Sequence, residues 1–275
     1  MHSTVSDGTD TPKELLEKVK STRLGLFSLT DHDAYKGCLE IISALKPGDP
    51  RFITGVEFSC RDEDGKYHIL GYNYDTEKPS IGRLVETGHR NRMMKIQWRM
   101  DFVKEAFGFT FSDEDVKWLL SLDNPGKPHL ANMMVKYGYV TDKETAIREF
   151  IDKGKIKQLE VRPEDAIEAI LQSGGIPVLA HPSYGSGEEL ILGDEMDKRL
   201  QKLIGYGLQG VEGFYSGFTF KLIREVLGFA RKYHLYVTAG SDYHGTNKMI
   251  ELGDNNLVHV AGSVPGLIRF MKKVL

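Results

Sequence analysis

The chain has 275 residues, of which 40% are hydrophobic, and its formal net charge at pH 7 is -3. This length and composition allow a full hydrophobic core, which excludes an intrinsically disordered protein. A slightly acidic chain lacks the broad basic surface that grips duplex nucleic acid, so we expect no such partner.

The amino-terminal part alternates between short helices and strands. Thr11-Pro12-Lys13-Glu14 has the spacing of a capping box with proline at the first helical position, which predicts a helix over 12–21. Apolar runs and breaks then predict, in order, a strand at 24–29, a helix at 35–45, and strands at 52–58 and 67–74. The turn-like residues 62–66 predict that the last strand returns antiparallel to its predecessor or over the sheet edge.

After Ile81 the strand signal stops and only helical periodicity remains. The predicted helices are 83–107, 113–122, 128–137 and 142–152. We therefore predict an inserted helical cap domain over residues 81–157, within a barrel domain formed by 1–80 and 158–275. Trp98 and Trp118 are expected in the core of the insertion.

Strands and helices alternate again from Pro163 onward. Pro163 opens a helix that Gly174 ends. The following elements are predicted at 176–180 (strand), 195–205 (helix), 209–214 (strand), 218–233 (helix), 235–239 (strand) and 267–275 (helix). Such alternation predicts an α/β fold with a parallel sheet or barrel and right-handed crossovers.

Several of the apolar runs end in residues that bind metals. His32, Glu57, His181, Asp242 and His244 all lie at or just beyond the end of a predicted strand. The carboxyl ends of parallel strands open on one face, so these side chains are expected to converge there. A cluster of imidazoles and carboxylates predicts a multinuclear metal site. Asp31 is expected to orient a ligand from outside the cluster, and Asp33 to cap the following helix.

Six segments, in this order and spacing, resemble the motif set of the PHP (polymerase and histidinol phosphatase) superfamily. They are His2-Ser3-Thr4-Val5-Ser6-Asp7-Gly8, Thr30-Asp31-His32-Asp33, Gly55-Val56-Glu57, His68-Ile69-Leu70-Gly71-Tyr72, Ala180-His181-Pro182 and Gly240-Ser241-Asp242-Tyr243-His244-Gly245. Pro128-His129 inside a helical insertion makes the chain most similar to the branch of small metal-dependent phosphoesterases typified by bacterial 3',5'-nucleoside bisphosphate phosphatases. The resemblance extends over essentially the whole chain.

The resemblance implies a distorted (βα)7 barrel with metals at the carboxyl ends of its strands. The ligands that it implies are His2, Asp7, His32, Glu57, His68, His181, Asp242 and His244. Among them we expect Asp7, His32, Glu57 and His181 to be catalytic. We expect two or three divalent metals, and a mixed histidine and carboxylate set suits Mn²⁺, Zn²⁺ or Fe²⁺, among which the sequence does not choose.

The first motif departs from the family pattern. In the family it reads His-x-His and follows a strand, whereas Met1 here occupies the middle position. The first histidine and the first strand are therefore missing from this chain. Because every later ligand is present, we expect a shortened amino terminus rather than a lost ligand. One metal would lose an imidazole, and the barrel would have a gap where its first strand should run.

Basic residues of the insertion are candidates for holding the substrate. Related proteins place arginines near Arg90 and Arg92, and a GRPH run where this chain has Gly126-Lys127-Pro128-His129. The resemblance thus implies that Arg90, Arg92, Lys127 and His129 bind phosphate. Lys127 keeps the positive charge of the family arginine but loses its bidentate fork.

We predict a phosphoesterase that uses a metal-activated hydroxide to remove the 3'-phosphate from a 3',5'-bisphosphonucleotide. Three alternatives remain: a 5'-3' exonuclease on short oligonucleotides, a degenerate non-catalytic metal-binding domain, and a metal-dependent deacetylase or amidohydrolase. Only two cysteines, Cys38 and Cys60, are present, and neither a leader nor a membrane-spanning run is seen, so we expect a cytoplasmic protein without a membrane partner. The sequence leaves the oligomeric state open.

Overall fold

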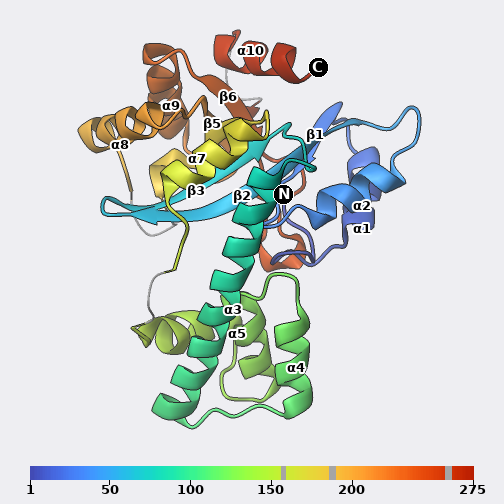
Figure 1. The fold of residues 1–275 in the computed structure, drawn as a ribbon, viewed down its shortest axis with the longest axis vertical. Helices are drawn as coiled ribbons and strands as arrows, with labels where there is room; N and C mark the ends of the chain where they lie inside the picture. Colours follow the sequence, from blue (N-terminus) through green and yellow to red (C-terminus); the bar gives the residue numbers. More distant parts are fainter. Residues whose placement is uncertain (156–158, 186–189, 258–261) are drawn as a thin grey trace.

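A six-stranded curled sheet with helices on its outer side forms the upper part of the molecule (Figure 1). The computed structural model describes residues 1–155, 159–185, 190–257 and 262–275. The strands, which lie in the sheet in chain order, are β1 (Leu26–Leu29), β2 (Arg51–Asp62), β3 (Gly65–Tyr72), β4 (Ile176–Leu179), β5 (Gly210–Tyr215) and β6 (Tyr236–Gly240). The predicted α/β fold is confirmed, and the sheet forms part of a barrel.

The sheet mixes parallel and antiparallel pairs. β1 and β2 are parallel, β3 is antiparallel to both β2 and β4, and β4, β5 and β6 are parallel. The antiparallel return of β3 is thus confirmed. The physical reason is the length of the connection, because only Glu63 and Asp64 join β2 to β3 and a parallel crossover needs a dozen residues or more.

The helices of this part begin and end close to the predicted positions. They are α1 (Pro12–Lys20), α2 (Lys36–Ala44), α7 (Pro163–Gln172), α8 (Gly193–Gly205), α9 (Phe220–Lys232) and α10 (Pro265–Val274). The predicted capping box is present, since the Thr11 hydroxyl accepts the Glu14 backbone N–H at 3.2 Å and Glu14 Oε2 accepts the Thr11 N–H at 2.8 Å. α7 packs against β2, β3 and β4, α9 against β5 and β6, and α10 against β6.

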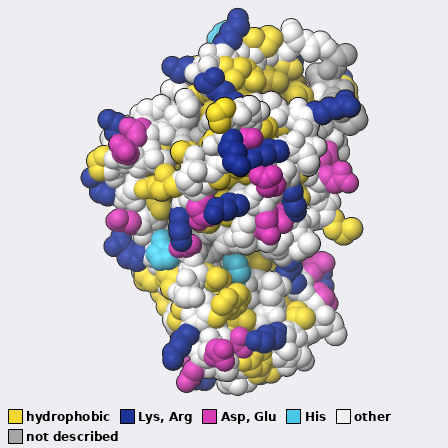
Figure 2. Space-filling model, turned by 90° about the vertical axis from the view of Figure 1, so that its right-hand side faces the viewer, with side chains coloured by type: hydrophobic (Ala, Val, Ile, Leu, Met, Phe, Trp, Pro, Cys, Tyr) yellow, Lys and Arg dark blue, Asp and Glu magenta, His cyan; other side chains and the backbone are white. Residues whose placement is uncertain are grey.

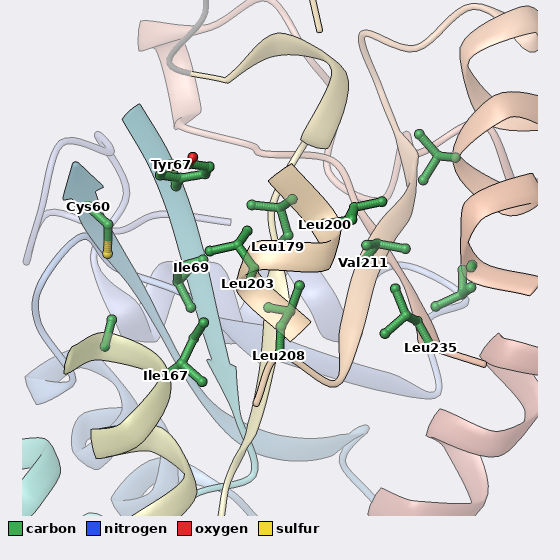
Figure 3. Packing of buried hydrophobic residues seen from close by; sticks show 14 of the residues in the cluster. Cys60, Tyr67, Ile69, Ile167, Leu179, Leu200, Leu203, Leu208, Val211 and Leu235 are labelled. Carbon is green, nitrogen blue, oxygen red and sulfur yellow. The ribbon is translucent and has the colours of Figure 1, made fainter. Parts of the chain in front are cut away.

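The main hydrophobic core lies between the sheet and these helices. Ile69, Leu179 and Val211 project from three strands toward Ile167 of α7 and Leu203 of α8 (Figure 3). The side chains of Ile69, Ile167, Leu203 and Val211 are all fully buried. Burying each of them contributes on the order of 2 kcal/mol, so this core fixes the strands whose ends form the site.

A helical segment extends away from the sheet (Figure 1). It consists of the long helix α3 (Pro79–Phe107), α4 (Asp113–Ser121), α5 (Lys127–Lys136), the short α6 (Lys143–Thr145), a π-helical turn (Ala146–Phe150) and a 3₁₀ turn (Ile151–Lys153). The predicted regular helix at 142–152 is therefore wrong, because those residues form three short pieces.

The helical segment has its own hydrophobic cluster, which includes Ile96, Leu119 and Leu130. Trp118 is 46% exposed, so its expected place in this core is wrong. The division into a barrel domain and a cap domain stays a prediction, and its second boundary, at residues 157 and 158, lies outside the described residues.

The barrel is open between β1 and β6, which are the two edges of the sheet. A cavity of about 590 Å³ lies inside the curl, and residues of both edge strands line it, including Phe27 and Thr238. This opening agrees with the expected gap at the position of the first barrel strand. Among the helices of the described residues, none combines the length and the apolar sequence that crossing a membrane requires.

Candidate metal centre

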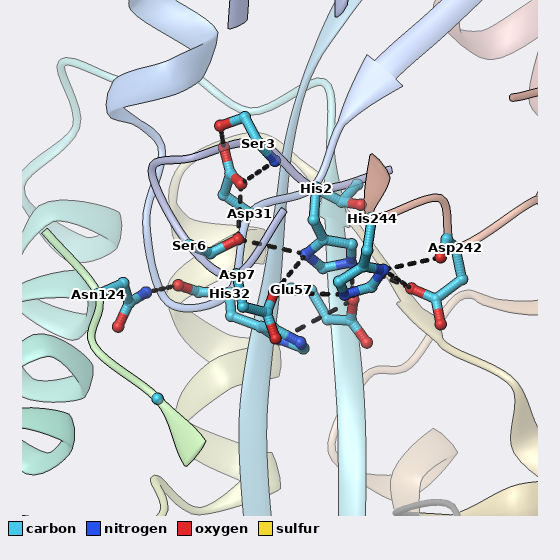
Figure 4. A network of polar contacts seen from close by, with 12 residues as sticks. His2, Ser3, Ser6, Asp7, Asp31, His32, Glu57, Asn124, Asp242 and His244 are labelled. Carbon is cyan, nitrogen blue, oxygen red and sulfur yellow. Dashed lines mark hydrogen bonds and ion pairs between the residues drawn. The ribbon is translucent and has the colours of Figure 1, made fainter. Parts of the chain in front are cut away.

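Side chains from six separate segments meet at one end of the sheet. Figure 4 shows those of His2, Asp7, His32, Glu57, Asp242 and His244. The contributing residues are His2 and Asp7 before α1, His32 after β1, Glu57 of β2, His68 of β3, His181 after β4, and Asp242 and His244 after β6. Three overlapping groups could each hold a metal ion, because within each group the potential ligand atoms lie within 4.8 Å of one another. The first group is His2, Asp7, His32 and His244, the second is His32, Glu57 and His68, and the third is His2, Glu57 and Asp242. These groups contain seven of the eight predicted ligands, and the eighth, His181, lies with its Nε2 3.3 Å from Glu57 Oε1.

Glu57 lies at the centre of this group. Its Oε1 is 2.7 Å from Nδ1 of His68 and 3.3 Å from Nε2 of His181, while its Oε2 is 3.0 Å from Nε2 of His2. The side chain is buried. Because its two oxygens face different histidines, Glu57 is placed where a carboxylate could bridge two ions.

The residues fit a transition metal. Nδ1 of His32 is buried without a hydrogen-bond partner among the described residues, and its nearest carboxylate, Glu57 Oε2, is 4.0 Å away. Buried polar atoms are normally hydrogen-bonded, so an unpaired nitrogen aimed at a carboxylate cluster indicates an absent ligand. The imidazole and carboxylate donors are those that Mn²⁺, Zn²⁺ and Fe²⁺ accept.

The protonation states of Glu57 and His32 suit cation binding, whereas that of His2 does not. Burial opposes ionisation of Glu57, but its interactions with the surrounding histidines, including hydrogen bonds with His181 and His2, outweigh that effect, and the pKa of Glu57 lies well below its usual value. Burial holds the pKa of His32 well below its usual value, which keeps this imidazole neutral. In His2, burial is outweighed by hydrogen bonds with Asp242 and Glu57, which raise its pKa to about 9. Metal binding must therefore displace a proton from His2 at neutral pH.

A second set of residues holds the ligands in position. Asp31 accepts hydrogen bonds from the Ser3 N–H, the Ser3 hydroxyl and the Ser6 hydroxyl, each at 2.7 Å. The Ser6 oxygen in turn lies 3.4 Å from Nδ1 of His2, so Asp31 supports the loop that carries His2. Glu212, which the sequence did not suggest, accepts the His181 backbone N–H at 2.8 Å.

Three non-glycine residues at the site have left-handed backbone conformations. The φ angles of Asp33, His181 and Asp242 are +48°, +26° and +53°. Such conformations are costly for residues with a Cβ, and they persist only where surrounding contacts over-determine them. Asp33 does not cap the following helix as expected. It accepts hydrogen bonds from the Ser59 N–H and from Arg92 instead, at 3.0 and 2.7 Å.

Two cavities adjoin the cluster. One, of about 370 Å³, is lined by His32, Glu57, His68, His181, Tyr184, Tyr215, Gly217, Asp242 and Lys248. The other, of about 350 Å³, lies between the sheet and α3; Asp7, His32 and His68 line one end of it, and Arg92, Lys95, Arg99 and Lys127 line the rest with their neighbours. A substrate group at the ligand cluster can therefore extend in either direction.

The four predicted phosphate-binding residues do not lie together. Arg92 and Lys127 line the cavity beneath α3, but Arg90 and His129 line neither cavity. Arg90 is exposed and donates to the Thr87 hydroxyl at 3.3 Å. Nδ1 of His129 accepts the Gly126 N–H at 3.0 Å, so this imidazole caps the start of α5.

Sequence reasoning missed several residues that line the cavities. Lys95 and Arg99 follow Arg92 at intervals of three and seven, which places the three on one face of α3. This spacing was a signal in the sequence. Lys248, which forms an ion pair with Asp242, and Tyr184 gave no comparable signal. On the face drawn in Figure 2, basic and acidic side chains are interspersed, and the absence of a duplex nucleic acid partner stays a prediction.

Comparison with known proteins adds four similarities, three by sequence and one by structure. A family model described as the PHP domain matches residues 1–152. A 3',5'-nucleoside bisphosphate phosphatase from Chromobacterium violaceum is 29% identical over 251 residues, or 88% of this chain and 85% of the relative. A 5'-3' exoribonuclease from Haemophilus influenzae is 29% identical over 257 residues, or 92% of each chain.

A solved structure from Bifidobacterium adolescentis, whose description as a metal-dependent phosphoesterase is itself provisional, superimposes with a TM-score of 0.82. It is 27% identical to this chain, and the match covers 92% of this chain and 89% of that one.

Proposed function

Because the chain belongs to the PHP domain family, we propose that it hydrolyses a phosphomonoester of a small nucleotide, namely the 3'-phosphate of a 3',5'-bisphosphonucleotide. Metal-dependent phosphoester hydrolysis follows from the family and from the activities of its relatives. The identity of the substrate, a 3',5'-bisphosphonucleotide, is the proposal. The observation that carries it is the cluster of seven potential ligands, with His181 3.3 Å from Glu57 as the eighth, beside a cavity lined with basic side chains.

Two groups of ligands would hold the metals. His2, Asp7, His32 and His244 form one, and Glu57 joins it to His68, His181 and Asp242. Bound divalent metals supply a hydroxide nucleophile at neutral pH and neutralise charge on the phosphoryl oxygens. Among the eight residues we propose that Asp7, His32, Glu57 and His181 are the catalytic ligands. Each of them lines a cavity beside the cluster: His32 lines both, Glu57 and His181 line the first, and Asp7 lines the one beneath α3.

The remaining residues would bind and orient the substrate. Arg92 is held by Asp33 and Ser59, so its guanidinium has a fixed position at the side of the cavity. A positive charge fixed in advance costs little ordering entropy when an anion binds. Tyr184 and Tyr215 border the other cavity, where flat aromatic rings suit the nucleoside part.

Phosphate release tests the proposal. The full chain loaded with Mn²⁺, Zn²⁺ or Fe²⁺ should convert adenosine 3',5'-bisphosphate to adenosine 5'-monophosphate and inorganic phosphate. His32→Asn should abolish the release, whereas the matched variant His234→Asn, at an exposed histidine, should retain it. Wild-type protein that holds its metals and releases no phosphate would rule out this substrate.

An exonuclease on short oligonucleotides is the second candidate, because the Haemophilus influenzae relative is named as a 5'-3' exoribonuclease. The same cluster could cleave a diester if the cavity beneath α3 admits a longer chain. Stepwise shortening of a 5'-phosphorylated RNA on a gel would favour it. An intact RNA under conditions that hydrolyse the bisphosphate would favour the phosphatase.

A further inference from the structure

Within the described part of the chain, Arg99 is a cation of the cavity beneath α3 that its surroundings do not neutralise. Four basic side chains of α3 and α5 line it, namely Arg92, Lys95, Arg99 and Lys127. Arg92 is paired with Asp33 at 2.7 Å, Lys95 with Glu160 at 2.6 Å, and Lys127 with Asp152. Arg99 has no hydrogen bond or ion pair with any residue in the part of the chain that the structure describes.

The guanidinium of Arg99 is desolvated as well as unpaired. Its Nε is buried without a partner among the described residues. Burial lowers the pKa of Arg99, which the more distant charges of Asp152 and Glu160 only partly oppose. A buried donor without an acceptor is destabilising, so an arginine retained in this state indicates that an acceptor arrives from outside.

The position of Arg99 selects the kind of acceptor. The cavity that it lines reaches Asp7, His32 and His68 of the ligand cluster at its other end. A substrate held by its scissile phosphate at that cluster can therefore extend a second group along α3 toward Arg99. A planar guanidinium can bind two oxygens of a phosphate group through parallel N–H···O hydrogen bonds.

We propose that Arg99 binds a second, non-scissile phosphate of the substrate, one ribose away from the phosphate at the ligand cluster. This inference rests on the proposed function and makes Arg99, rather than the exposed Arg90, the specificity-determining residue for doubly phosphorylated substrates. Lys95 lies one turn away and supports the same group, although Glu160 already neutralises it. The second phosphate could be the 5'-phosphate of a mononucleotide or an internal phosphate of a short oligonucleotide.

Substrate discrimination tests the role of Arg99. With Mn²⁺-loaded full chain, Arg99→Met should raise the KM for adenosine 3',5'-bisphosphate by about 10- to 100-fold. Hydrolysis of adenosine 3'-monophosphate, which lacks the second phosphate, should change by less than about threefold. Arg83→Met, at an exposed position of the same helix, is the matched control and should affect neither substrate. Equal effects of Arg99→Met on both substrates, or none on either, would overturn the inference.

A binding measurement separates this inference from the proposed function. Titration calorimetry with adenosine 5'-monophosphate should show about 10-fold or greater weakening in Arg99→Met, and none in Arg83→Met. If wild-type protein binds this nucleotide through Arg99 but hydrolyses no bisphosphate, the proposed function fails and the inference stands. If the bisphosphate is hydrolysed equally by wild type and Arg99→Met, the inference fails and the proposed function stands.

A third substrate identifies the source of the second phosphate. If Arg99→Met raises the KM for the bisphosphate alone, the second phosphate is the 5'-phosphate of a mononucleotide. If Arg99→Met raises the KM for a 5'-phosphorylated dinucleotide, the second phosphate is an internal phosphate of an oligonucleotide. If Arg99→Met changes the KM for neither substrate, the inference is overturned.

Discussion

At the scale of single residues, Glu57 connects the largest number of candidate ligands, since its two oxygens contact His2, His68 and His181. Glu57→Gln keeps the shape of the side chain and removes the charge that would bridge two cations. We expect the purified variant to lose at least one metal ion per chain by elemental analysis and its phosphoesterase rate to fall by at least about 100-fold.

Glu63→Gln, at an exposed carboxylate in the β2–β3 turn, is the control for Glu57→Gln. It should retain the metal content of the wild type. A Glu57→Gln protein with the same metal content would show that this carboxylate is not a ligand.

Glu212 provides a pH-dependent prediction. Burial raises its pKa to about 7 in the folded protein, so the folded state binds this proton more tightly than the unfolded state. The resulting stability is complete below the ordinary glutamate pKa and is lost as the pH rises through about 7. Glu212→Gln keeps an acceptor for the His181 N–H but does not titrate.

We therefore compare the free energy of unfolding of the metal-free wild type with that of Glu212→Gln. The wild-type value minus the variant value should fall by about 1–3 kcal/mol between pH 5 and pH 8. Urea unfolding at several pH values measures this difference. A difference that is constant across the range would contradict a raised pKa at this position.

At the scale of elements, the two faces of α3 contact different parts of the molecule. Its apolar face, with Ile96, Met100 and Val103, belongs to the hydrophobic cluster of the helical segment. Its basic face lines the cavity next to the ligand cluster. The helix therefore links the stability of the helical segment to the position of the basic residues that line the cavity.

Ile96→Ala tests this link, because the side chain is fully buried. Its removal should lower the free energy of unfolding by about 2–5 kcal/mol in urea. Met94→Ala, at a 43% exposed neighbour on the same helix, should change it by about 0.5 kcal/mol or less. Metal content should be unchanged in both variants, and loss of metal from Ile96→Ala would show that the helical segment is needed to form the cluster.

At the scale of the whole molecule, the ligand cluster joins segments from both ends of the chain. Asp7 near the amino terminus is 3.3 Å from His244, and His2 is 3.2 Å from Asp242. An unfolded chain cannot hold these residues together, so cations should bind the folded state and stabilise it.

Calorimetry measures this effect of metal on the entire fold. Metal at about 100 times its dissociation constant should add about 2.7 kcal/mol to the free energy of unfolding, and a chelator should remove the gain. Asp242→Asn should show a smaller gain than wild type. An unfolding temperature that is insensitive to both metal and chelator would contradict a metal centre formed by folding.

The sequence by itself predicted the order of the elements, their types outside residues 142–152, and the strand-end residues of the ligand cluster. Strand-end residues such as His32 and His181 follow from local hydrophobic runs, and the Thr11 capping box follows from residues three positions apart. These features are local, so a single sequence carries them. The motif resemblance added His2, Asp7 and His68, which the structure places with the others.

Only the tertiary structure decided which basic residues face the cluster. Arg90 and Arg92 lie about 200° apart around α3, and the rotation of that helix against the sheet turns Arg92, Lys95 and Arg99 inward and leaves Arg90 exposed. The antiparallel β3–β4 pairing and the contact of Glu212 with His181 were likewise unavailable from the sequence. Each depends on packing between segments far apart in the chain, and local periodicity does not encode how distant segments are rotated and paired.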